Sequence, residues 1–374
     1  MSLRTSILSL TTAAAVTAGA FTAPVATAAS YPSAGSVPVA QLDVNQPDGA
    51  LAYVFADPVM KSKSDLAVRQ VRELRAKAWD ANLPYKNSTV QSVARAHGFS
   101  SREAYANAIS WDSGLEHAAL QRAAEANYEF AHVRTVGVDT PEVIDHMVAA
   151  ENLTHENMEH AVASWSTQGS RGSSEWDQLI ARNGAWTMGT GHLMNMLEPT
   201  HTKFAQAQVG GATAGLYAWD DISGDPEPLQ DGRYAFPIAI PEDSLDRAEL
   251  ITSGGTNLGS TGSLGLAWGG QVGIPVASPS SSDPEVFEVN SDGTYEAKSE
   301  GTATVTLKTF DMVNGQPQLS GTEVSKTVKV TKKSLLGSSS TGGTDVGTIV
   351  GIIAGLLALI GVAAQVARQL GILR

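Results

Sequence analysis

Apolar side chains recur at helical spacing in several stretches between residues 64 and 130. The clearest stretch follows Gly114, where apolar positions come at intervals of four, four, three and four, so they share one face of a helix. Residues 64–80 show a similar spacing, a shorter helix over 90–96 ends at Gly98, and Ser100 with Glu103 predicts a capping box for a third helix. The clearest stripe consists of Leu115, Ala119, Ala123, Ala126 and Phe130.

The pattern remains helical in pieces from 162 to 197, with Gly/Ser-rich breaks at 169–174 and 184–191. Ser174 is expected to cap a helix that begins at Glu175. Residues 209–220 then alternate loosely, carry several aromatic side chains and predict a strand. Because helices come first and a strand closes this part of the chain, the predicted fold class is α+β.

The composition changes near residue 221, where Pro226 and Pro228 mark a linker. Residues 250–331 are rich in Thr, Val, Ser and Gly and contain an Asp-Gly turn at Asp292. Short alternating stretches surround that turn, for instance over 301–310, and they predict a small β-sandwich.

Both ends of the chain carry apolar runs. Arg4, an Ala-rich run over 7–25 and a small-x-small site over 26–28 predict a secretory leader. Residues 346–364 form an uncharged apolar run whose helix would be about 28 Å long, which matches the hydrocarbon thickness of a bilayer. Arg368 and Arg374 follow this run and favour a cytoplasmic C-terminus. We therefore expect a protein on the extracellular side of the membrane, attached through a C-terminal helix.

Charge and cysteine content narrow the class of protein. The chain has no cysteine and a net charge of −13. An exported domain without disulfides must rely on its core, which favours a Gram-positive cell surface. A chain this acidic repels phosphate backbones, so we expect no nucleic-acid partner.

All eight histidines fall between His97 and His201, so any histidine chemistry belongs to one region. Two of them, His132 and His192, lie on separate segments, and Glu151 lies between them in the sequence. These side chains can converge only if the chain folds back on itself. Two imidazoles with one or two carboxylates suit Zn²⁺ or another divalent cation.

These segments resemble the CAP superfamily, which comprises cysteine-rich secretory proteins, antigen 5 and pathogenesis-related 1 proteins. The matching pieces are LEHAALQRAAEANYEFAH (115–132), AENL (150–153), AVASW (161–165), TGHLMNML (190–197) and AGLYAWD (214–220). The resemblance implies an α-β-α sandwich whose cleft carries two histidines and two acidic residues.

Carried over by position, the resemblance implies a metal site formed by His132, Glu151, Glu175 and His192. The second acidic position is ambiguous, because the family usually places it three residues after a tryptophan, where this chain has Gln168. We favour Glu175, which precedes His192 by a spacing common in the family, and keep Gln168 as the alternative. Glu151 and Glu175 are also the candidates for a general base.

A second resemblance covers SSDPEVFEVNSDGTYEAKSEGTATVTL (281–307), which is similar to bacterial Ig-like domains of surface adhesins. The expected architecture is thus a CAP-like sandwich, a small Ig-like β-sandwich and a single C-terminal transmembrane helix. The expected parts are a signal peptide (1–28), a flexible arm (29–60), a CAP domain (61–222), a linker (223–249), an Ig-like domain (250–331), a spacer (332–345), an anchor (346–367) and a tail (368–374).

Three functions fit these patterns. The first is a binding module whose cleft takes a divalent cation and a lipid, sterol, peptide or host surface component. The second is a metal-assisted hydrolase of peptide or cell-wall bonds. The third is an adhesin in which the Ig-like part carries the binding.

Overall fold

The computed structural model describes residues 46–56, 60–137, 148–167, 173–220, 227–231, 234–268 and 272–332. The predicted leader, anchor and tail, and Gln168, lie outside these residues. No helix within the described ranges is both long enough and apolar enough to span a membrane.

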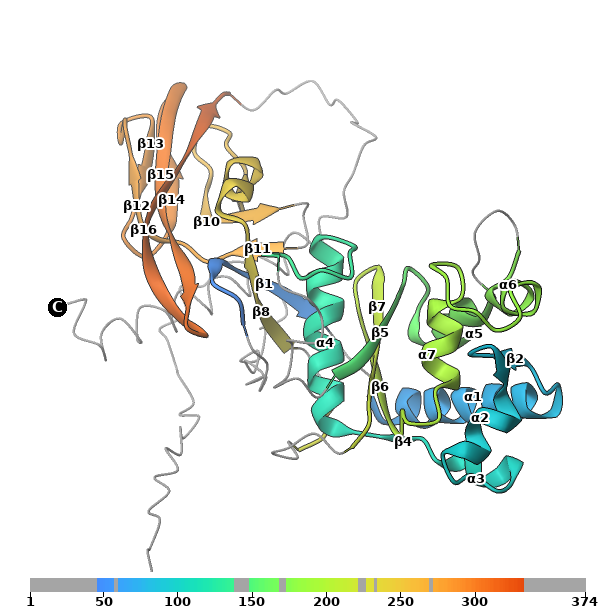
Figure 1. The fold of residues 1–374 in the computed structure, drawn as a ribbon. Helices are drawn as coiled ribbons and strands as arrows, with labels where there is room; N and C mark the ends of the chain where they lie inside the picture. The colour runs from blue at the N-terminus through green and yellow to red at the C-terminus, as the bar shows by residue number, and fades with distance from the viewer. Residues whose placement is uncertain are drawn as a thin grey trace, which may run out of the picture. The chain divides into compact units, whose positions relative to one another are not determined.

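The first part of the chain is mostly helical around a small sheet of four strands (Figure 1). The helices of this part are α1 (Met60–Asp80), α2 (Val90–Ala96), α3 (Arg102–Asn107), α4 (Ser113–Tyr128), α5 (Met158–Thr167), α6 (Glu175–Ala181) and α7 (Gly191–Leu197). The sheet has the order β4 (Ser110–Trp111), β6 (Lys203–Val209), β7 (Ala212–Ala218) and β5 (Val148–Thr154). Two short strands, β2 (Pro84–Tyr85) and β3 (Ser88–Thr89), pair separately.

Helix α4 packs along β6 and β7 on one face of this sheet, and α1, α5 and α7 contact the sheet from the other side (Figure 1). Strand β5 lies at the edge next to β7, with Glu151 opposite Leu216. The predicted strand over 209–220 corresponds to β7, which begins after a turn at residues 210–211 that joins it to β6 in a hairpin.

Serine hydroxyls cap the first turns of α3 and α6. The Ser174 hydroxyl accepts a hydrogen bond from the Asp177 amide, which confirms the predicted cap of α6. The predicted cap of α3 is wrong by one residue: Ser101, not Ser100, accepts from the Ala104 amide. Both serines precede the helix, and the extended backbone of Ser101 makes it the N-cap.

Helix α4 is buried on nearly every side, since fourteen of its sixteen residues are buried. Besides β6 and β7 it contacts β8 (Tyr234–Ile240), a strand of the second sheet. A helix covered by two sheets cannot place its polar residues in water, so they need partners inside the protein. These buried polar residues are Glu116, His117, Gln121, Arg122 and Glu125.

The second sheet has ten strands, and its strand pairs are antiparallel. Its path runs through β12 (Ala277–Ser281), β15 (Gly301–Val313), β1 (Gly49–Ala56), β11 (Val272–Ile274), β10 (Thr261–Trp268), β14 (Thr294–Ala297) and β13 (Phe287–Val289). Off this path, β16 (Gln316–Val330) pairs with β15, β8 with β1, and β9 (Glu249–Thr252) with β10. A 3₁₀ helix, η3 (Glu242–Arg247), joins β8 to β9.

The predicted fold class, an α-β-α sandwich followed by a small Ig-like β-sandwich, is wrong, and the transmembrane helix that completes the prediction lies outside the described residues. The ten-stranded sheet is nearly closed and barrel-like, and it is not built from residues 250–331 alone. Strand β1 lies in the segment expected to be a flexible arm, and β8 in the segment expected to be a linker. The physical reason is that β1 pairs with β8 from Ala50 to Ala56 and also pairs with β11 and β15.

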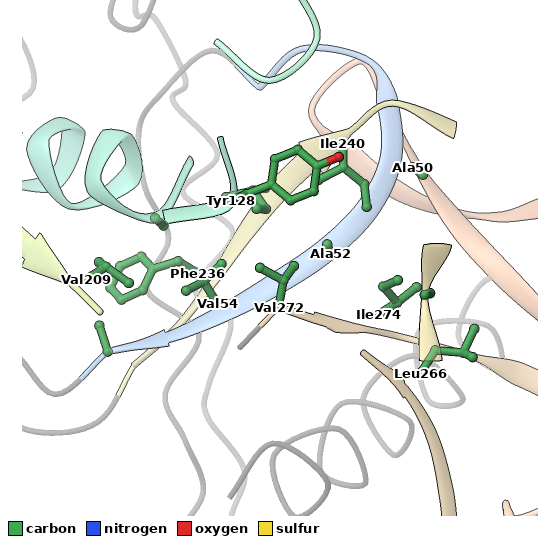
Figure 2. Close-up of a cluster of buried hydrophobic side chains, with 14 of the residues drawn as sticks. Ala50, Ala52, Val54, Tyr128, Val209, Phe236, Ile240, Leu266, Val272 and Ile274 are labelled. Atoms are coloured by element: carbon green, nitrogen blue, oxygen red, sulfur yellow. The ribbon is translucent and has the colours of Figure 1, made fainter. Parts of the chain in front are cut away.

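The core of the second sheet explains why β1 belongs to it. Figure 2 shows Ala52 and Val54 of β1 beside Phe236 of β8 and Val272 of β11. The ring of Tyr128, at the end of α4, lies in the same cluster. Burial of these apolar side chains stabilises the pairing of strands that are far apart in the sequence.

Candidate functional site

Four separate segments of the chain position the four residues expected to form a metal site. His132 lies four residues beyond the end of α4, and Glu151 lies in the middle of β5. Glu175 is the first residue of α6, and His192 is the second residue of α7. The structure brings all four together in two carboxylate–imidazole pairs.

Each histidine contacts one carboxylate through the same ring nitrogen. His132 Nδ1 lies 2.9 Å from Glu151 Oε2, and His192 Nδ1 lies 2.9 Å from Glu175 Oε1. The two rings are 6.0 Å apart between centroids. The carboxylates are buried, whereas the His132 side chain is 59% exposed and that of His192 is 23% exposed. The site therefore presents its imidazoles to solvent and keeps its carboxylates beneath them.

Backbone and amide contacts hold the two pairs in register. Glu175 Oε2 accepts from the Leu193 amide at 2.7 Å, so this carboxylate caps the first turn of α7 as well as contacting His192. The Asn152 amide donates to the His192 carbonyl at 3.0 Å, and Asn195 donates to the Asn152 side chain at 2.8 Å. These bonds tie β5, which carries Glu151, to α7, which carries His192.

The hydrogen-bonding pattern determines which atoms could bind a cation. An ionised carboxylate only accepts hydrogen bonds, so a neutral imidazole held in this way has its proton on Nδ1 and its lone pair on Nε2. Carboxylates behind metal-binding histidines commonly orient the rings in this way. Among the described residues, no group of three or more His, Cys, Asp or Glu side chains is arranged to hold a metal. In this geometry the two histidines are the side chains that could donate to a cation, and the two glutamates lie behind them.

The same contacts bear on the candidate general bases. Both oxygens of Glu151 are engaged, one by His132 and the other by the Arg122 Nε, which donates at 2.7 Å. Both oxygens of Glu175 are also engaged, by His192 and by the Leu193 amide. A carboxylate held in this manner is poorly placed to remove a proton from a bound water.

Arg122 and two further charged residues were missed by the sequence analysis. Arg122 and Glu125 lie on α4 and form a buried ion pair, and Arg134 Nη2 donates to Glu125 Oε1 at 2.6 Å. Burial raises the pKa of Glu125, but Arg134 and Arg122 outweigh that effect and lower its pKa below the ordinary value. The available signal was two charged residues, three apart, in a helix otherwise rich in alanine.

Compared with known proteins, the chain matches no protein-family model and no curated sequence.

Proposed function

We propose that this chain is an extracellular binding protein whose His132/His192 pair binds a divalent cation, which in turn contacts an organic ligand. One observation carries the proposal: two adjacent imidazoles are each held by a buried carboxylate on Nδ1, and this leaves Nε2 as the donor. A purely structural histidine does not need this arrangement twice within one site.

The charge around the pair favours a cation. The carboxylates of Glu125, Glu151 and Glu175 outnumber the guanidinium groups of Arg122 and Arg134 by one when the histidines are neutral. Because most of these groups are buried, solvent screens them less than it screens surface charges. We expect this net negative charge to favour a cation at the imidazoles.

The chemistry of the two imidazole donors limits which cations could bind. Imidazole nitrogens suit Zn²⁺, Cu²⁺, Ni²⁺ or Fe²⁺, whereas Ca²⁺ and Mg²⁺ prefer oxygen donors. Two protein donors leave coordination positions for water or for an oxygen of a lipid, sterol or peptide ligand. When bound, the cation would polarise that oxygen, while His132 and His192 hold it and Glu151 and Glu175 orient the rings.

Hydrolysis is a less favoured function, because both candidate bases are already engaged by two partners each. The predicted leader supports a location outside the cytoplasm, where such a site would meet its ligand.

Zinc titration of the full chain by calorimetry tests the proposal. The chain should bind one zinc ion per molecule, and the His132→Ala/His192→Ala double variant should lose that binding. A matched control is the His155→Ala/His160→Ala double variant, which removes two exposed histidines from elsewhere in the same region and should bind as the parent does. Equal binding by all three proteins, with equal circular dichroism, would overturn the proposal, as would no binding by the parent chain.

A further inference from the structure

A single guanidinium group, that of Arg122, contacts three segments around His132. Its Nε donates to Glu151 Oε1 at 2.7 Å, and its Nη2 donates to the Ala131 carbonyl at 2.9 Å. Its Nη1 pairs with Glu125, one turn further along α4. Arg122 therefore joins the supporting carboxylate of His132 to the backbone immediately before His132.

The segment that follows His132 is held by the same buried ion pair, that of Arg122 and Glu125, through Arg134. Arg134 contacts both oxygens of Glu125, with Nη2–Oε1 and Nε–Oε2 distances of 2.6 and 3.1 Å. His132 thus lies between two residues, 131 and 134, that are both tied to the Arg122–Glu125 pair. Although the His132 side chain is exposed, its backbone is anchored on each side.

The network also has support on the side away from the site. The Gln121 amide donates to Glu125 Oε1 at 3.0 Å and to the Pro237 carbonyl of β8 at 2.9 Å. Arg122 and Glu125 are 1% and 0% exposed, so the pair is removed from water almost entirely. The position of Arg122 is therefore set by rigid partners.

Energy alone does not account for such a pair. Removing two charges from water is costly, and apolar side chains of similar volume often stabilise a core as well or better. An apolar side chain at position 122 could not orient Glu151 or hold the Ala131 carbonyl. Unlike an apolar side chain, the Arg122 guanidinium makes a directional hydrogen bond with Glu151, the carboxylate that supports His132.

We propose that Arg122 is a positioning residue that holds Glu151 in the orientation that keeps the proton of His132 on Nδ1. This inference rests on the proposed cation-binding function for its biological meaning, but the orientation of the ring can be measured without any metal. Glu175 supports His192 as Glu151 supports His132, but Glu175 is held by the Leu193 amide and not by an arginine. The orientation of the His192 ring therefore does not depend on Arg122.

The test is the Arg122→Lys variant of the full chain, which keeps the positive charge but removes the planar fork. Ring nitrogen shifts of ¹⁵N-labelled histidine, recorded without metal at pH 8.5, report which nitrogen carries the proton. The parent should show His132 and His192 both protonated on Nδ1. In Arg122→Lys, the His132 signals should move toward the Nε2-protonated form while those of His192 stay in place.

Substitution of a buried arginine that contacts neither Glu125 nor Glu151 controls for a general loss of packing in the core. Arg75 is fully buried and donates to the backbone carbonyls of Met196, Glu198 and His201. Arg75→Lys should leave the His132 signals unchanged. Unchanged His132 signals in Arg122→Lys, or equal movement of both histidines in the two variants, would overturn the inference. If Arg122→Lys does not fold, Arg134→Lys carries the same comparison, because Arg134 holds Glu125 and through it Arg122.

Zinc affinity then separates the two proposals. Loss of an outer support of this kind typically weakens metal binding by about 10–100-fold, and we expect Arg122→Lys to fall in that range. If the parent binds no zinc but its His132 tautomer still depends on Arg122, the proposed function fails and the positioning role stands. If zinc binds while the tautomer is indifferent to Arg122, the positioning role fails alone.

Discussion

Glu116 offers the sharpest quantitative test of how α4 is buried. Its side chain lies in the first turn of α4, is 2% exposed, and accepts a hydrogen bond from the Leu229 amide at 3.1 Å. Burial raises the pKa of Glu116 to about 7, although hydrogen bonds from Leu229 and Trp111 oppose that rise. The charged form is therefore disfavoured in the folded protein, and Glu116→Gln removes the group that titrates.

The sign and size follow from linkage. Below pH 4.5 this carboxyl is protonated in both the folded and the unfolded chain and costs nothing. Between pH 4.5 and 7 only the unfolded chain ionises, so the parent loses stability as pH rises. A pKa difference of 2.5 units corresponds to roughly 3 kcal/mol above pH 7, at about 1.4 kcal/mol per unit. Glu116→Gln should thus gain about 3 kcal/mol relative to the parent between pH 4.5 and 8.

Urea denaturation of the parent and Glu116→Gln from pH 4.5 to 8 measures this difference. Any constant offset from the changed hydrogen bonding cancels when the two pH values are compared. Glu103→Gln is the control, because Glu103 is exposed and its pKa is lowered chiefly by a backbone hydrogen bond and by Arg102. The contribution of a carboxyl with a lowered pKa changes only as the pH falls below 4.5, so the difference between the parent and Glu103→Gln should stay flat across this range. A free-energy difference between parent and Glu116→Gln that is flat with pH would refute the reasoning.

Two further predictions test the packing of each sheet. Gly215→Ala should lower the free energy of unfolding, measured by urea denaturation, by about 1–3 kcal/mol, because the new Cβ would lie 2.4 Å from the ring of buried Trp165. Gly211→Ala is the control, because no atom of the described residues lies near its Cβ position, and its stability should equal that of the parent. Equal effects of the two substitutions would contradict the packing described. Ala52→Asp should abolish cooperative unfolding of the large sheet, because it places a carboxylate in the hydrophobic core that β1 helps to form. Thr327→Asp is the control, because Thr327 is exposed on β16 and the substitution should be tolerated. A folded Ala52→Asp protein would show that β1 is not part of the core.

The helices could be predicted because their signals are local. Spacing near 3.6 residues identified the helix after Gly114, and Ser174 identified the start of α6, since a cap depends on residues three apart. The same locality explains the error at α3. Ser100 and Ser101 are adjacent, and the choice between them depends on backbone angles that the sequence pattern does not show.

The large sheet could not be assembled from local signals. Strand β1 pairs with β8, where Leu51 lies opposite Ala239, and with β15, where Ala50 lies opposite Asp311. Nothing in residues 49–56 indicates partners so far along the chain. Composition placed a boundary near residue 221, but the pairing of β1 joins the two sides of that boundary in one sheet.

The site shows a similar division between residue type and role. Sequence reasoning found His132, Glu151, Glu175 and His192 because imidazoles and carboxylates are suitable metal donors, but spacing cannot show which atom faces which. Since each carboxylate contacts an Nδ1 atom, the proposed cation site would have two imidazole donors instead of four protein donors. A cation held by two imidazoles is coordinatively incomplete, so its affinity should rise when a ligand oxygen supplies another donor. Cation and ligand binding at this site are therefore expected to be coupled, each strengthening the other by the same factor.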